Sequence, residues 1–435
     1  MKRVNLILTL VLALMLPCTL LACGKEAEKA PEATAGTPVS AYKSGDGYTD
    51  LGDEKLSREG LDALPQKYAG MTPQEAREIC LTFWRYCKTA LWIPDAKYDI
   101  YSDENGQQVY QRGMEQGRIY AGLPYVSTAT GSIYRLLDFI DPDTGVVNVT
   151  EAGENPLTFG GMCSSGCYWA WARVMNSADY TWTHSIVTRK GFIRVGPYTY
   201  DDTIFRFSSD YGTHTVVEEN GEQIMFESYA QMVAGDGMGY SRDGGVGHIV
   251  MCSIDPVVVR NEDGTIDGVN SYLHIIDQGG VWEDGVSANG LQYQYECSLD
   301  KKLTFATLFQ KCYIPFTFAD LIGTDPIEET EISYSYSGET ITKMQILSNK
   351  ATSNYAFSDI YVYIYDDAGT EVLKLATRVN GPSVKELRAS QDAGHSYTWG
   401  SWDNLSPTGS YTVKIQVQLA TGERPTVYEG KLAFE

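Results

Sequence analysis

Residues 160–174 read GGMCSSGCYWAWARV and place Cys163 where a helix is expected to begin. The two preceding glycines permit a tight turn into the helix, and the apolar run that follows can continue it into a core. A thiol at a helix N-terminus has a lowered pKa, which makes Cys163 a candidate nucleophile. Cys167 lies about one helical turn later and is expected to face the core, although it remains the alternative nucleophile.

A catalytic thiol needs a base, and the best candidate is His248 in the stretch GGVGHIVMCSI. The apolar residues after this histidine predict a strand that begins at it. The next predicted strand, SYLHIIDQGG, offers His274, Asp277 and Gln278. Pairing the two strands as neighbours would bring one of these three beside His248. A carboxylate orients the ring and stabilises the imidazolium, so Asp277 is favoured, with Gln278 and His274 as alternatives.

Four short motifs follow one another within residues 115–285: GLPY at 122–125, MCSSG around Cys163, GHI at His248 and DQG at Asp277. Their order resembles the NlpC and CHAP branches of the papain-like cell-wall peptidases. In those families the nucleophile lies in a DCSG-type motif, the base begins a GHV-type strand, and CHAP members continue with an EQN-like acceptor. The GLPY stretch is similar to the GxPY element that precedes the nucleophile in NlpC-type domains.

This resemblance implies a papain-like α+β domain that hydrolyses amide bonds of peptidoglycan. It implies that Cys163, His248 and Asp277 form the catalytic triad and that Tyr125 contacts the substrate. It also implies that no organic cofactor takes part. The cysteines and histidines show none of the spacings typical of a zinc site, so no metal is expected.

Two positions differ from the families' pattern and keep alternatives open. Met162 stands where an aspartate usually precedes the nucleophile, and Gly279 stands where CHAP members have an asparagine. These differences favour a second hypothesis, in which the chain is a non-catalytic surface lipoprotein that binds cell-wall fragments. A third hypothesis is a transglutaminase-like acyltransferase, which would use the same triad chemistry.

The pattern of helices and strands predicts an α+β domain over residues 51–326. Thr72 and Glu75 form a capping-box pattern before a long amphipathic run, and a second helix is expected near Ser132. Beyond residue 181 the chain alternates strand-like runs with turn signals, and one strand-like run covers 213–226. Residues 255–270 are expected to form a long hairpin excursion between two strands. Helices followed by strands indicate N-terminal helices packed on an antiparallel sheet.

Residues 327–435 differ in character, because short alternating runs are separated by turn sequences such as DDAG and ATGE. About a hundred residues with this rhythm are typical of a β-sandwich. The segment contains no cysteine. We therefore expect an accessory domain that binds wall polymer or acts as a spacer.

The N-terminus indicates export. A basic start, an apolar run and the sequence LLAC predict a lipoprotein signal over residues 1–22, with lipid attached to Cys23 and the membrane as a partner. Residues 23–50 are small, charged and rich in turn formers, which predicts a flexible tether. The net charge of -22 argues against nucleic acid as a partner. The resemblance to cell-wall peptidases implies peptidoglycan or its peptide fragments as the partner.

Cysteine content agrees with a free thiol. The chain has nine cysteines, and Cys18 and Cys23 belong to the signal and the lipid anchor. The remaining seven is an odd number, so at least one thiol is expected to be unpaired in an exported monomer.

Overall fold

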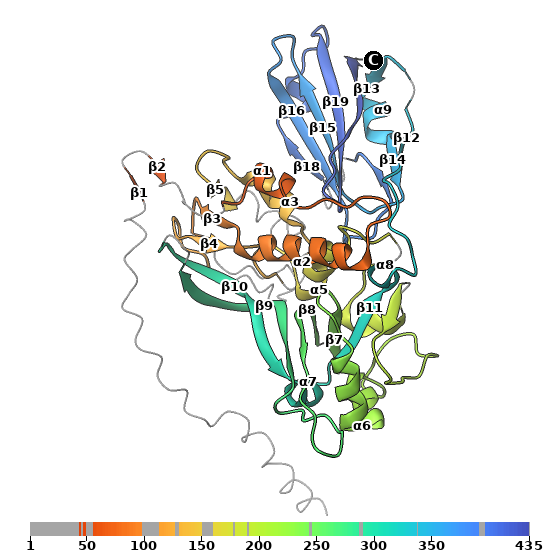
Figure 1. Cartoon of the computed structure of the whole chain (residues 1–435). Coiled ribbons are helices and arrows are strands. Elements are labelled where there is room, and N and C mark those ends of the chain that lie inside the picture. Colours follow the sequence, from red (N-terminus) through yellow and green to blue (C-terminus); the bar gives the residue numbers. More distant parts are fainter. Residues whose placement is uncertain are drawn as a thin grey trace, which may run out of the picture. The chain divides into compact units, whose positions relative to one another are not determined.

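The computed structural model shows a mixed α/β protein (Figure 1). The structure describes residues 43–44, 47–48, 55–97, 113–126, 130–149, 160–176, 179–188, 191–242, 246–286, 290–336, 338–390 and 396–434. The signal, Cys23 and nearly all of the tether lie outside the described residues. Tyr42–Glu435 form one compact unit. Within the described ranges, no helix has the length and apolar character needed to cross a bilayer.

The site is carried by a nine-stranded sheet of order β5-β3-β4-β10-β9-β8-β7-β11-β6. Its strands are β3 (Leu91–Pro94), β4 (Tyr120–Ala121), β5 (Val146–Val147), β6 (Phe192–Arg194), β7 (Gly237–Ser241), β8 (Gly247–Val257), β9 (Tyr272–Val286), β10 (Gln292–Thr304) and β11 (Ile314–Phe318). Every pair from β10 to β6 is antiparallel, as predicted, and β8 and β9 are neighbours.

The prediction of a purely antiparallel sheet is wrong at one edge, because β10 pairs with β4 in parallel and β3 pairs with β5 in parallel. These edge strands contain two to four residues. So short a segment shows no alternation in the sequence, which is why the edge was missed.

Helices precede and interrupt the sheet. They are α1 (Arg58–Asp62), α2 (Pro73–Thr89), α3 (Ile133–Leu136) continued by the 3-10 turn η2 (Leu137–Phe139), α5 (Cys163–Trp171), the 3-10 segment η3 (Thr183–Thr188), α6 (Thr213–Ala230), α7 (Phe305–Gln310) and α8 (Ala319–Ile322). The predicted capping box is present, since Thr72 Oγ1 accepts from the Glu75 N–H and the Glu75 carboxylate accepts from the Thr72 N–H. The helices expected at Ser132 and Cys163 are confirmed.

Helix α5 lies in the core, between α2 and the sheet. This helix packs against α2 on one side and against β8 and β9 on the other. Trp169 and Trp171 are buried, and their indole N–H groups donate to the carbonyls of Thr130 at 2.9 Å and Gly235 at 2.8 Å. These bonds satisfy the polar edge of each large ring, so the first turn of α5 is held in place by a rigid core.

The strand expected over 213–226 is instead helix α6. In the structure, Val216, Val217, Met225, Phe226 and Tyr229 are buried, and the chain breaks its helical path only at Gly221 (φ 75, ψ 168). Apolar residues three and four apart thus bury a helical face, and this tertiary packing overrides the local preference.

The hairpin excursion expected over 255–270 agrees with the structure. After β8 the segment is a turn region closed by one isolated antiparallel bridge between Arg260 and Ile266. Asp263 and Asp267 side chains accept hydrogen bonds from backbone N–H groups two residues further on. Such Asx turns offer the backbone an alternative to a sheet ladder.

The C-terminal residues form two further sheets, of order β12-β14-β17 and β13-β20-β19-β15-β16-β18. Their elements are β12 (Ile332–Tyr334), β13 (Thr340–Thr342), α9 (Lys343–Ser348), β14 (Lys350–Ser353), β15 (Phe357–Tyr365), β16 (Glu371–Arg378), β17 (Glu386–Arg388), β18 (Ser396–Trp399), the 3-10 turn η5 (Trp402–Asn404), β19 (Tyr411–Leu419) and β20 (Thr426–Ala433). The strand-rich character predicted for this segment is confirmed.

Buried ionic contacts join these strands to the α3–η2 segment. Asp138 accepts from Lys374 at 2.9 Å and from Arg378 at 3.0 Å. Arg135 forms an ion pair with Asp359 at 3.2 Å, and both side chains are fully buried. Removing one partner of such a buried pair leaves an uncompensated charge, so these contacts tie the C-terminal sheet firmly to the preceding helices.

Candidate active site

The turn that leads into α5 is built on the GLPY element. Gly160 has φ +94, and a Cβ there would lie 2.8 Å from the Pro124 carbonyl oxygen. The Gly161 N–H donates to that carbonyl at 3.0 Å, and Val126 N–H donates back to the Gly161 carbonyl at 3.1 Å. Tyr125 is bridged to Gly161 and is half-buried. The predicted substrate residue therefore lies beside the nucleophile turn, while its role in binding stays a prediction.

Cys163 is the first residue of α5, so its thiol lies where helix N–H groups have no partner within the helix. Ser165 caps the turn, because its hydroxyl accepts from the Met162 N–H at 3.0 Å. Met162 itself occupies the N-cap position, where its side chain offers no oxygen for a cap. The Cys163 side chain is buried, with 6% of its surface exposed.

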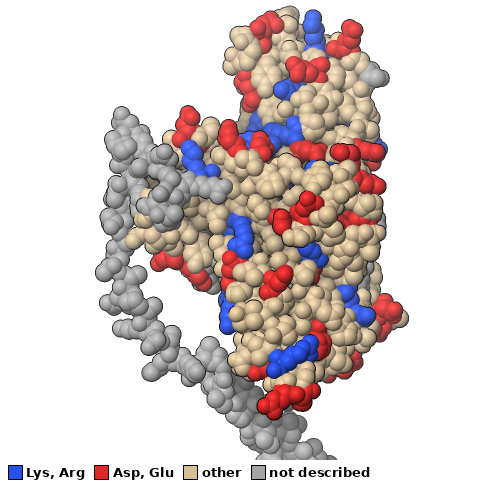
Figure 2. Space-filling model, in the orientation of Figure 1, with Lys and Arg blue, Asp and Glu red and all other residues tan. Residues whose placement is uncertain are grey.

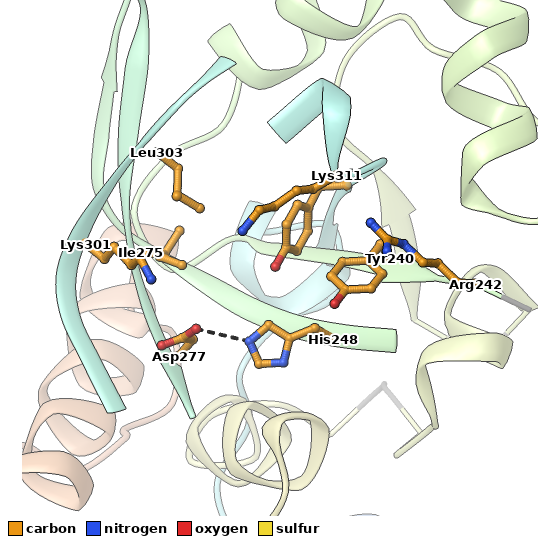
Figure 3. Close-up of a pocket in the computed structure, with 9 residues that line it drawn as sticks. Tyr240, Arg242, His248, Ile275, Asp277, Lys301, Leu303 and Lys311 are labelled. Atoms are coloured by element: carbon orange, nitrogen blue, oxygen red, sulfur yellow. Dashed lines mark hydrogen bonds and ion pairs between the residues drawn. The ribbon is translucent and has the colours of Figure 1, made fainter. Parts of the chain in front are cut away.

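His248 and Asp277 come from the neighbouring strands β8 and β9. The imidazole Nε2 lies 3.1 Å from Asp277 Oδ2, and Figure 3 shows the carboxylate pointing at the ring. The other carboxylate oxygen, Oδ1, accepts from the Ser298 N–H at 3.0 Å. Because Nε2 is engaged by Asp277, Nδ1 is the ring nitrogen left to exchange a proton with a thiol.

The thiol and the imidazole shift each other's pKa. Burial alone would raise the pKa of Cys163, but the charge of His248 and a hydrogen bond with it lower that pKa overall, helped by bonds with the backbone of Ile249 and Ser164. Burial alone would lower the pKa of His248, yet Cys163 and Asp277 raise it to about 10. These are the directions expected of a thiolate–imidazolium pair.

The acidic partner is ionised as well. Burial would raise the pKa of Asp277, but hydrogen bonding and attraction to His248, with further bonds from Ser298, hold it below its usual value. A charged carboxylate therefore faces a charged imidazole, which in turn faces the thiol. This chain of contacts is the geometry that nucleophilic catalysis requires.

Cys167, the alternative nucleophile, is fully buried one turn further along α5. Its sulfur lies 3.9 Å from the Ile249 carbonyl oxygen. Burial, with the neighbouring Cys163 charge, raises its pKa well above the usual value. An un-ionised buried thiol is a poor nucleophile, so the geometry favours Cys163.

The two alternatives to Asp277 lie elsewhere. Gln278 is fully buried, accepts a hydrogen bond from Lys88 and donates one to the Leu123 carbonyl at 2.7 Å. His274 packs edge-on against Tyr272, with ring centroids 5.5 Å apart, and its buried Nδ1 makes no hydrogen bond with the residues that the structure describes. The structure thus brings only Asp277, of the three, to hydrogen-bond distance of His248.

Tyr180 also reaches the start of α5. Its hydroxyl is 3.4 Å from Ser164 Oγ and 3.8 Å from Met162 Sδ. Burial, outweighing the hydrogen bond with Ser164, raises its pKa to about 12, so it stays protonated as a donor. With 30 tyrosines in the chain, no sequence signal distinguished this one.

A pocket of about 460 Å³ opens beside the His248–Asp277 pair. Its wall consists of Tyr240, Arg242, His248, Ile275, Asp277, Lys301, Leu303, Lys311 and Tyr313. Among the described residues, no group of three or more histidine, cysteine, aspartate or glutamate side chains is arranged to hold a metal ion.

Comparison with known proteins gives no further guidance. The sequence matches no protein-family model and none of the curated proteins.

Proposed function

We propose that this chain is an exported, lipid-anchored cysteine hydrolase that cleaves amide bonds in the peptides of peptidoglycan. One observation carries the proposal. The Cys163 thiol at the first position of a buried helix interacts with the His248 imidazole closely enough to lower its own pKa, and Asp277 orients that imidazole from 3.1 Å. The four motifs that resemble those of the NlpC and CHAP families suggest the choice of substrate, and the LLAC sequence suggests the anchor at Cys23.

The reaction would begin with attack of the Cys163 thiolate on the substrate carbonyl carbon. The oxyanion that forms would be stabilised by N–H groups of the first turn of α5, which have no acceptor within the helix, and the Tyr180 hydroxyl could add a further hydrogen bond. His248 then gives its Nδ1 proton to the leaving amine as the carbon–nitrogen bond breaks. The product of this half-reaction is an acyl group bonded to the Cys163 sulfur.

Water would complete the cycle. His248, now neutral, removes a proton from the water molecule as the oxygen attacks the thioester carbon. The carbon–sulfur bond breaks, the carboxylic acid leaves, and the thiolate–imidazolium pair is restored. Asp277 keeps its negative charge throughout and holds the ring so that Nδ1 points at the reacting atoms.

Residues 51–326 would then form a papain-like domain, and residues 327–435 a β-sandwich. A nucleophile helix packed on a sheet that carries the base and the acid on adjacent strands supports a papain-like domain over residues 51–326. The two C-terminal sheets support a β-sandwich over 327–435. Its buried contacts with Arg135 and Asp138 favour a role in supporting the catalytic domain over that of a loose spacer.

One observation favours the alternative of a non-catalytic lipoprotein that binds wall fragments. Only 6% of the Cys163 side chain is exposed, so a substrate carbonyl must displace neighbouring side chains to reach the sulfur. A transglutaminase-like transferase would form the same acyl-enzyme and pass the acyl group to an amine. The tests below separate all three functions.

The first experiment is labelling of the mature protein with iodoacetamide at neutral pH, followed by peptide mapping. Cys163 should react fastest, and a His248→Ala variant should lose that advantage, whereas Cys167 serves as the unreactive internal control. The second experiment is digestion of purified muropeptides by the wild type and by Cys163→Ala. New amine and carboxylate ends indicate a hydrolase, new amide bonds a transferase, and binding without turnover a binder.

A further inference from the structure

The pocket beside the triad is rimmed by three cationic side chains. Arg242 follows β7, Lys301 belongs to β10, and Lys311 follows α7, so distant parts of the chain converge here. Figure 3 shows the three side chains around the space next to the His248–Asp277 pair. All three are exposed at the surface.

Within the described part of the chain, none of these three cations forms an ion pair, whereas other surface cations do: Arg85 pairs with Asp300 at 2.6 Å, and Arg260 pairs with Glu227 at 2.6 Å. Arg242 lies over the Tyr240 ring at 5.3 Å. Among the described residues of the pocket wall, Asp277 is the one carboxylate, and it is hydrogen-bonded to His248.

A cluster of three cations is unexpected in a protein with a large negative net charge. The net charge is -22, and Figure 2 shows acidic side chains spread over the face in view. Three cations around one opening, unpaired among the described residues, therefore produce a local positive potential in an acidic protein. Such a potential attracts anions and disfavours cationic ligands.

The wall of the pocket includes His248 and Asp277 but not Cys163. In the proposed reaction the acyl part of a substrate becomes bonded to the Cys163 sulfur, whereas the leaving amine takes its proton from His248. The pocket borders the imidazole and not the thiol, which assigns it to the leaving group rather than to the acyl group.

We infer that this pocket binds an acidic leaving group, that is, an amine product that carries one or more carboxylates. Arg242, Lys301 and Lys311 supply the counter-charges, with Arg242 able to hold a carboxylate through two parallel N–H bonds. The inference rests on the proposed function for the identity of the leaving group. The anion preference itself follows from the pocket's charge alone.

The test is equilibrium binding to the full mature protein with Cys163→Ala, which prevents turnover. Two ligands of nearly equal shape are compared by calorimetry: alanyl-glutamate, with two carboxylates, and alanyl-glutamine amide, with none. We expect alanyl-glutamate to bind at least about tenfold more tightly, a difference of about 1.4 kcal/mol. Arg242→Gln and Lys311→Gln should each reduce this preference several-fold.

Lys302→Gln is the matched control. Lys302 is also an exposed lysine of β10, but its ammonium lies over the Tyr272 ring at 3.6 Å and it is not part of the pocket wall. Its removal should leave the preference unchanged. A loss equal to that of Arg242→Gln would show that overall charge, rather than the pocket, attracts the ligand, and this would overturn the inference.

Equal affinity for the two dipeptides, or binding of neither, also overturns the inference. These outcomes are distinct from failure of the proposed function, because binding to Cys163→Ala needs no catalysis. Conversely, a wild-type enzyme that cleaves muropeptides but releases acidic and neutral amines at equal rates would keep the proposed function and remove this specificity.

Discussion

Asp277 and Gln278 are consecutive in β9, yet their side chains face opposite sides of the sheet and meet different partners. Asp277 lies 3.1 Å from the His248 imidazole, whereas Gln278 is bonded to Lys88 and to the Leu123 carbonyl. Successive side chains of a strand alternate between faces, so one strand serves both the reactive site and the loop beside it. The two residues should therefore respond differently to substitution.

Replacing Asp277 by Asn should weaken the triad without unfolding the protein. The amide keeps the size of the carboxylate but removes its charge, so the pKa of His248 should fall from about 10 and the pKa of Cys163 should rise. At a pH below the pKa of a thiol, each unit by which that pKa rises reduces the thiolate fraction about tenfold. Iodoacetamide labelling of Cys163 near pH 6 should therefore slow by about tenfold or more. An unchanged labelling rate would remove Asp277 from the triad.

The wild type should show a reactive thiolate at a pH where an ordinary thiol is protonated. Because the pKa of Cys163 is lowered, its labelling rate should stay high below about pH 8.5 and fall only in more acidic solution. The pKa of His248 is about 10, so the imidazolium is present below that pH and is lost above it. Amide cleavage, which needs that proton, should fall as pH rises through about 10.

The control for this profile is the same measurement on His248→Ala. Without the imidazolium, the buried thiol should titrate near or above the ordinary value, and the labelling rate should rise only in alkaline solution. A wild-type profile that coincides with that of the variant would contradict the thiolate–imidazolium pair.

Gln278→Ala should destabilise the fold and leave the pH profile of Cys163 in place. The substitution removes one hydrogen-bond acceptor of the buried Lys88 ammonium and the side-chain donor to the Leu123 carbonyl. Hydrogen bonds to charged groups contribute about 1.5–3 kcal/mol, and we expect a loss of free energy of unfolding in that range or above. Urea denaturation measures it, with exposed Gln292→Ala on β10 as the control.

An altered pH profile in folded Gln278→Ala would contradict this division of roles. It would mean that the amide acts on the imidazole through the GLPY loop. Comparison with Asp277→Asn then separates the two effects, because the aspartate variant should change the profile and keep most of the stability.

The parts of this site that the sequence predicted are those whose evidence lies in neighbouring residues of the chain. The Cys163 helix and the His248 strand were predictable because glycine turns and apolar periodicity lie within about ten residues of each. Asp277 followed from pairing two strands that are adjacent in the chain. These features need no knowledge of distant contacts.

The features that were missed depend on residues far apart in sequence. Tyr180 approaches α5 from a separate loop, and the pocket cations come from three separate elements. The helix over 213–230 was mistaken for a strand because its β-branched residues pack on a buried face that only the tertiary structure provides. Local propensity is a weak guide where packing decides.

The last prediction concerns the turn that positions the nucleophile. Gly160 has φ +94, and a Cβ there would lie 2.5 Å from Val126 Cγ2 and 2.8 Å from the Pro124 carbonyl oxygen. Gly160→Ala therefore adds a steric clash to the strain of a left-handed backbone, at a cost of about 1–3 kcal/mol. Relief of the clash should displace the GLPY loop or the first turn of α5, and Cys163 labelling should slow.

Gly369→Ala is the matched control, because Gly369 has φ +79 but no atom within 4 Å of the added Cβ. It lies in the turn between β15 and β16, away from α5. Both variants should lose stability in urea from backbone strain, and only Gly160→Ala should slow the labelling of Cys163. Equal labelling rates in the two variants would show that the reactivity of the Cys163 thiol does not depend on how this turn packs. The lowered pKa of the thiol would then have to be attributed to its contact with His248 alone.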